Sequence, residues 1–119
     1  MINLLIDEGY YVDFLSILEV KLLKSDDKTR DSLSKQFLFY SNSLGEQIGD
    51  SKLEEILDSV LYKKLKDVNQ ILFETIDNCK KYQIDARTID AMNHTRWILK
   101  NEIQRTFFGK STGEVKIGY

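Results

Sequence analysis

The residue best placed to recognise a ligand or a partner by charge is Arg96, which lies within the apolar sector of the last predicted helix. A buried guanidinium without partners is costly, so a carboxylate or several carbonyl groups should meet it. The polar residues that we expect near it are Asp7, Asp90, Asn93 and Glu102. Two interpretations stay open. The favoured one is a structural ion pair or a snorkelling side chain, and the other is an anion-binding or partner-binding pocket.

A second candidate site is acidic. Glu54 and Glu55 are followed by Asp58, and Glu74 is followed three residues later by Asp77. This spacing resembles the E-x-x-E and E-x-x-D arrangement of the all-α nucleotide pyrophosphohydrolases of the MazG and dimeric dUTPase type. The resemblance covers about twenty-four residues and implies that Glu55, Asp58, Glu74 and Asp77 hold Mg²⁺ against the phosphates of a nucleotide. Asp58 stands where the family pattern has Glu.

The geometry of a helix weakens this magnesium alternative. On one continuous helix Glu55 and Glu74 would be about 28 Å apart. A sharp turn near residues 62–66 would be needed to bring the two acidic groups together. We therefore favour a solvated charged face, with no cofactor, and keep the magnesium-dependent hydrolase as the alternative.

Three further motifs predict no chemistry. Residues 109–112 have the letters that end a phosphate-binding P-loop, but position 104 is Gln instead of Gly and no strand precedes it. His94, the only histidine, has no second His or Cys at ligand spacing. Cys79 lies on an apolar stripe and is interpreted as a core residue. Because no complete catalytic set can be assembled, we expect a protein that is not an enzyme.

These residues must be positioned by helices. Apolar residues recur at helical spacing through four stretches, which are joined by short polar turns. The predicted fold is one all-α domain over residues 1–119, an antiparallel four-helix bundle. A short irregular tail ends it, although alternating Val115, Ile117 and Tyr119 could instead form a strand with residues 1–5. The predicted helices and tail are residues 4–24, 28–48, 52–82, 86–108 and 110–119.

The ends of these helices have recognisable capping residues. Residues 25–27 and Asp85 offer side-chain oxygens to a helix N-terminus, and Ser51 begins a capping-box pattern. Gly49 and Gly109 predict C-terminal caps in a left-handed conformation. Gly9 interrupts the first helix at a cost of about 1 kcal/mol relative to alanine, so a close packing contact is expected there.

The third predicted helix is the one whose continuity matters most. Its apolar residues repeat every eleven positions through Leu57, Val68 and Cys79, which favours one rod from residue 52 to 82. The polar segment 62–64 could instead divide it into two helices. A rod would hold the two acidic groups apart.

Composition excludes several classes of function. The formal net charge is −2, and only four of the seventeen basic residues are arginine, so a nucleic-acid partner is not expected. No apolar run approaches the roughly 20 residues that span a bilayer, and a membrane partner is not expected either. A single cysteine, Cys79, excludes an internal disulfide, which favours a reducing cytoplasm.

Three segments, residues 1–10, 16–21 and 102–108, resemble small uncharacterised proteins of marine T4-like bacteriophages. That resemblance implies the cytoplasm of a bacterial host and no particular activity. Apolar side chains in excess of one stripe per helix point to contact with another protein or with a second copy. These side chains are Leu38, Phe39, Trp97 and Phe108. The predicted function is therefore a protein-interaction or accessory domain.

Overall fold

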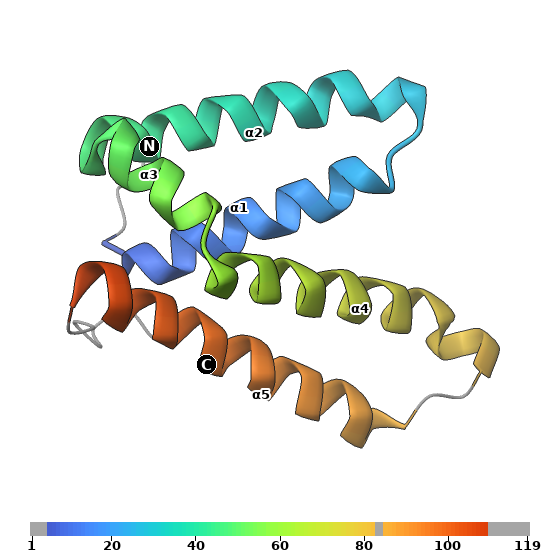
Figure 1. The fold of residues 1–119 in the computed structure, drawn as a ribbon. Coiled ribbons are helices and arrows are strands. Elements are labelled where there is room, and N and C mark those ends of the chain that lie inside the picture. The colour runs from blue at the N-terminus through green and yellow to red at the C-terminus, as the bar shows by residue number, and fades with distance from the viewer. Residues whose placement is uncertain (1–4, 83–84, 110–119) are drawn as a thin grey trace.

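Helices make up almost all of the structure, a computed structural model that describes residues 5–82 and 85–109, with side chains described for residues 5–76 and 85–109. Five α-helices are followed by a short π-helical turn, η1 (Figure 1). Their bounds are α1 Glu8–Leu23, α2 Asp27–Ile48, α3 Asp50–Leu57, α4 Val60–Tyr82, α5 Ala86–Ile103 and η1 Gln104–Phe108. The predicted all-α class is confirmed for the described ranges.

Most helix ends lie where the capping residues predict. The side chains of Asp26 and Asp85 accept hydrogen bonds from backbone N–H groups in the first turns of α2 and α5, both at 3.0 Å. Gly49 and Gly109 have φ angles of 93° and 81°, a region that a residue without Cβ enters at little cost. The predicted capping box at Ser51 is wrong, because α3 already begins at Asp50 with Gly49 as its N-cap.

The predicted rod over residues 52–82 is wrong, because the helix is interrupted between α3 and α4. The backbone of Asp58 leaves the helix at φ −87° and ψ −7°. The Ser59 hydroxyl then donates to the Ile56 carbonyl at 2.6 Å and accepts from the Tyr62 amide at 3.1 Å. A serine that bonds neighbouring backbone groups in this way competes with the helical ladder and caps the next helix. The break lies before the polar segment 62–64, which was the alternative position for a division of this helix.

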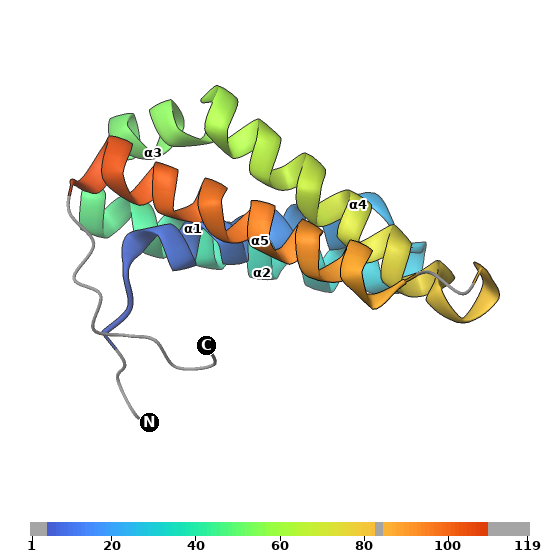
Figure 2. The ribbon, with the colours of Figure 1, turned by 90° about the horizontal axis from the view of Figure 1, so that it is seen from below.

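Helix α1 lies at the centre of the fold and packs against α2, α4 and α5 (Figures 1 and 2). The sequence of α1 explains this position, since its apolar residues surround the helix instead of forming one stripe. Helices α1 and α2 run in opposite directions side by side, and so do α4 and α5. The buried core consists of Val12, Leu15, Leu44, Leu53, Ile56, Tyr62, Leu65 and Ile103.

The start of α1 lies very close to α5, which accounts for Gly9. A Cβ atom at this position would be 2.7 Å from the Lys100 carbonyl oxygen, too short for any other residue without a shift. The Gly9 amide donates to the Gln104 side chain at 2.6 Å. The close packing contact expected at this glycine is confirmed.

Two further predictions concern a membrane span and the C-terminal tail. No helix in the described part of the chain is long and apolar enough to cross a membrane. The tail predicted at residues 110–119 lies outside the described residues, and so do residues 1–4 of the segment 1–5 with which it could pair.

Candidate functional site

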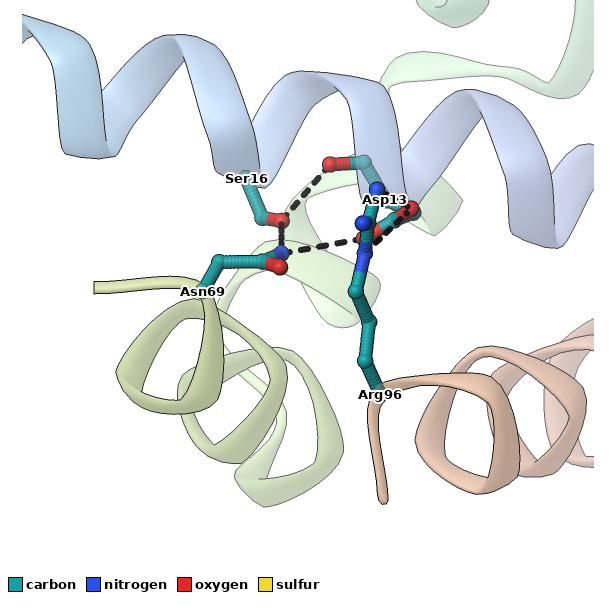
Figure 3. A network of polar contacts seen from close by, with 4 residues as sticks. All are labelled: Asp13, Ser16, Asn69 and Arg96. Atoms are coloured by element: carbon teal, nitrogen blue, oxygen red, sulfur yellow. Dashed lines mark hydrogen bonds and ion pairs between the residues drawn. The ribbon is translucent and has the colours of Figure 1, made fainter. Parts of the chain in front are cut away.

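A partly buried ion pair joins α1 and α5. Arg96 of α5 donates from Nε to both oxygens of Asp13 in α1 at 3.1 Å, and from Nη2 to Oδ2 at 2.7 Å (Figure 3). The Asp13 side chain is 4% exposed and the Arg96 side chain 31% exposed. The guanidinium thus presents one edge to the carboxylate, and part of it reaches the surface.

Two neutral side chains complete the network around the Asp13 carboxylate. Asn69 of α4 donates from Nδ2 to Asp13 Oδ1 at 2.9 Å and to the Ser16 hydroxyl at 2.7 Å. Ser16 donates in turn to the backbone carbonyl of Asp13 at 2.7 Å. Asn69 and Ser16 are both buried. The network therefore links three helices, α1, α4 and α5, through one carboxylate (Figure 3).

A second cation lies near this carboxylate. Lys100, one turn after Arg96 in α5, is buried, and its Nζ lies 3.9 Å from the centroid of the Tyr10 ring. Burial lowers the pKa of Lys100, the Asp13 charge acts in the opposite direction, and the Arg96 charge lowers the pKa further. The aromatic face stabilises the charged ammonium where water is scarce.

The arrangement is suited to holding helices together and poorly suited to catalysis. The Asp13 carboxylate accepts bonds from Arg96 and Asn69 and is only 4% exposed, so little of it is open to a substrate. The Ser16 hydroxyl donates to a carbonyl group, whereas a nucleophile needs a general base at that position. The same geometry makes the stability of the fold depend on both partners, because removal of Arg96 leaves the buried Asp13 carboxylate without its guanidinium partner.

One side of the network opens into a small pocket of about 150 Å³. Asn69, Asn93 and Arg96 form its polar side. Apolar residues of α1 and α4 form the rest: Ile17, Val20, Leu72, Phe73 and Ile76. A volume of this size accommodates a group no larger than one aromatic side chain.

The predicted site is brought together only in part. Arg96 meets a carboxylate, as expected, but the carboxylate is that of Asp13. Asp7 lies at the N-cap of α1 and Asp90 is exposed on α5. Asn93 joins Arg96 at the small pocket, and Glu102 pairs with Arg105.

The sequence does carry a signal for the residues that this prediction missed. Asp13, Ser16 and Glu19 interrupt a stretch of α1 that is otherwise apolar, so burial of such residues is expected when α1 is central. Asn69 lies between Leu65 and Leu72 on the apolar face of α4, just as Arg96 lies on that of α5. Polar residues on apolar faces are the common signal, and each needs a buried partner.

Another polar link joins α1 to α4 further along the helix. The buried Tyr62 hydroxyl donates to Glu19 Oε1 at 2.7 Å, and Lys66 pairs with Glu19 Oε2 at 3.2 Å. Burial raises the pKa of Tyr62 well above its ordinary value, and the charge of Glu19 raises it further. The phenol therefore stays protonated and acts as a hydrogen-bond donor.

The acidic residues of the magnesium alternative lie apart. Glu55 is exposed on α3 and Asp58 ends that helix, whereas Glu74 lies about 21 Å along α4 from its first residue. Glu74 pairs with Lys24 at 2.9 Å, and this hydrogen bond and charge lower its pKa. The Asp77 side chain is outside the described residues. Among those described, no group of three or more His, Cys, Asp or Glu residues could hold a metal ion.

The remaining motifs have ordinary surroundings where they are described. Exposed His94 stacks on Trp97, with ring centroids 5.8 Å apart. Gly109 ends η1, and residues 110–112 of the P-loop-like segment are outside the described residues. The side chain of Cys79 is also outside them.

Comparisons with known proteins find no relative for this arrangement. No protein-family model, curated protein or solved structure matches the chain.

Proposed function

We propose that this protein is a non-enzymatic interaction domain that binds another protein or a second copy through an aromatic surface on α1 and α2. We define the aromatic surface by the contacting rings of Phe14, Phe39 and Tyr40 together with exposed Leu38, the residue before Phe39 on α2. The observation that carries the proposal is the exposure of large apolar side chains there. Leu38 is 60% exposed and Phe39 is 65% exposed.

The rings of this surface support one another. Phe14 meets Tyr40 edge to face with centroids 4.9 Å apart, and Phe39 meets Tyr40 at 5.1 Å. The Tyr11 hydroxyl donates to the backbone carbonyl of Tyr40 at 2.9 Å and so fixes α1 against α2. A partner would meet rings that are already ordered, which reduces the entropy lost on binding.

Burial of such side chains supplies enough free energy for recognition. Full burial of one Phe or Leu side chain is worth about 1.5–3 kcal/mol. Aromatic residues are also enriched where protein interfaces concentrate their binding energy.

Trp97 and Phe108, which were also expected in an apolar contact surface, are not part of the aromatic surface. Trp97 is 47% exposed on α5 and belongs to a separate surface. Phe108 packs against the core, with the Lys52 ammonium 4.8 Å from its ring centroid. Phe108 is therefore left out of the proposed contact surface.

The test compares two substitutions at equally exposed positions. Phe39 and Val60 are 65% and 66% exposed, so Phe39→Ser and Val60→Ser remove apolar surface without opening the core. Sedimentation velocity from micromolar to near-millimolar concentration should show association that Phe39→Ser weakens and Val60→Ser leaves unchanged. A photo-crosslinking residue at 39 should capture a partner or a second copy, while one at 60 should not. Equal behaviour at both positions in both assays would refute the proposal.

The non-enzymatic part of the proposal is tested separately. Incubation with a nucleotide panel and Mg²⁺ should release no pyrophosphate. If pyrophosphate is released, and if Glu55→Gln or Glu74→Gln abolishes that release, the protein is a hydrolase and the non-enzymatic proposal is refuted.

We also propose that the four long helices, α1, α2, α4 and α5, act as an antiparallel bundle with α3 as a connecting helix. The phage resemblance supports a protein of the host cytoplasm.

A further inference from the structure

A second surface of the protein is a lysine-lined cleft at the end of α1. It lies between the C-terminal turns of α1, the first half of α2 and Phe73 of α4, and its volume is about 790 Å³. We call it the lysine cleft and define it by Lys21, Lys24, Lys28 and Phe73. Sites for small ligands commonly occupy about 300–1,000 Å³, and this cleft has a comparable volume but is widely open to solvent.

The charge of the cleft is opposite to that of the chain. Three lysines line it, and no carboxylate is among its described lining residues, although the formal net charge is −2. Lys24 is held in place by Glu74 at 2.9 Å. Lys21 and Lys28 take part in no ion pair within the described residues. Two ammonium groups that form no ion pair among the described residues thus line the same open space.

The backbone at the N-terminus of α2 is not what would bind an anion here. The Asp26 side chain already accepts from the Thr29 amide and hydroxyl, both at 3.0 Å, and these bonds lower the pKa of Asp26. Recognition would therefore fall to the lysines, with the hydroxyl of Ser32 beside them, since the Ser25 hydroxyl donates to the Leu22 carbonyl at 2.8 Å. Ammonium and hydroxyl donors are common ligands of phosphate groups.

The cleft also has an apolar wall. Leu33 and Phe73 are partly exposed within it, and Lys24 Nζ lies 5.8 Å from the Phe73 ring centroid. A ligand that satisfies both sides of the cleft needs an anionic group and an apolar group of ring size. Inorganic phosphate would satisfy only the lysines.

The charges around the cleft favour a compact anion over an extended acidic peptide. Asp26, Asp27 and Asp31 are exposed on the first turns of α2 beside the cleft. Carboxylates spaced along a peptide would meet this acidic rim, whereas a phosphate group concentrates its charge against the lysines. We infer that the lysine cleft binds a phosphate ester of nucleotide size, with the phosphate on the lysines and the ring against Leu33 and Phe73.

The inference is tested by titrating the full chain with ATP, AMP, adenosine and inorganic phosphate, followed by calorimetry and amide chemical shifts. ATP should bind with shifts centred on residues 21–36, more tightly than phosphate or adenosine alone. Binding should weaken as salt is raised, because screening reduces attraction between exposed charges. The double variant Lys21→Gln with Lys28→Gln should weaken ATP binding at least about tenfold, about 1.4 kcal/mol.

A matched control is available on α4, where Lys63 and Lys64 are also exposed. Lys63→Gln with Lys64→Gln removes the same charge away from the cleft and should leave ATP binding unchanged. Phe73→Leu should reduce the advantage of AMP over inorganic phosphate while leaving phosphate binding intact. Circular dichroism of each variant establishes that it is folded.

Four results would overturn the inference. They are no binding of any probe at millimolar concentration, an equal loss in the two double-lysine variants, phosphate binding as tight as ATP binding, and tighter binding of hexaglutamate than of ATP at the same residues. The last result would assign the cleft to an acidic protein segment. None of these outcomes bears on the aromatic surface, which is tested with Phe39→Ser.

Discussion

Loss of Arg96 is the perturbation with the largest expected effect. In Arg96→Met the apolar stem of the side chain is kept, but the Asp13 carboxylate loses its hydrogen bonds from the guanidinium (Figure 3) and keeps the bond from Asn69 and the nearby charge of Lys100. Removing one partner of a buried pair typically costs about 3–5 kcal/mol. Because Arg96 is 31% exposed and water can partly replace it, we expect about 3 kcal/mol.

This magnitude converts into a measurable shift of the melting temperature. With 119 residues and an unfolding entropy of about 2.1 cal/mol/K per residue, the entropy of unfolding is about 0.25 kcal/mol/K. A loss of about 3 kcal/mol therefore lowers Tm by about 12 °C. Thermal and urea unfolding followed by circular dichroism measure the effect. Arg87→Met, at an exposed position on the same helix, should change stability by about 0.5 kcal/mol or less.

The double variant decides whether the loss arises from an uncompensated charge. Asp13→Asn combined with Arg96→Met removes the ion pair and should recover part of the stability lost in Arg96→Met, because the buried carboxylate is gone while Lys100 loses the favourable charge of Asp13. The reasoning is refuted if Arg96→Met costs less than about 1 kcal/mol. It is also refuted if the double variant is as unstable as the single one.

Three other predictions follow from contacts described above. Gly9→Ala should destabilise the protein by about 1–3 kcal/mol in urea, since the new Cβ would lie 2.7 Å from the Lys100 carbonyl, and a stabilised variant would contradict this contact. Asp26→Ala should destabilise the protein at neutral pH. Because folding lowers the pKa of Asp26 from its ordinary 3.8, its stabilisation is present above that pH and fades as pH falls below it, so the two proteins should converge in acid unfolding curves. Tyr62→Phe should cost about 1–2 kcal/mol through the lost bond to Glu19. In the wild type, the raised pKa of Tyr62 means that stability falls as pH rises above 10, where the unfolded phenol ionises, and a folded tyrosinate signal from Tyr62 near pH 10 would contradict its burial.

The sequence predicts the helices well because their signals are local. Asp26, Asp85 and Gly49 mark helix ends through bonds to nearby backbone or through a positive φ, and neither depends on the tertiary fold. The break at Ser59 was missed for a related reason. A serine within an apolar pattern is compatible with a helix interior as well as a cap, and only its bonds to Ile56 and Tyr62 distinguish the two.

Only the arginine of the candidate ion pair could be predicted from the sequence. The position of Arg96 on an apolar face requires a buried acceptor, and that requirement is met. Which acceptor meets it depends on how α1 rotates against α5, and side-chain periodicity within one helix contains no such information. Asp13 was therefore overlooked, although it lies in the most apolar helix of the fold.

The Asp13–Arg96 pair also has a consequence for the order in which the chain matures. The two residues are separated by 83 positions. A nascent chain that has emerged from the ribosome only as far as α4 must keep this carboxylate hydrated, because Arg96 has not yet left the ribosome. Helix α1 is thus translated first but becomes fully buried only after α5 has emerged. In a product truncated before α5, α1 would be exposed to proteases.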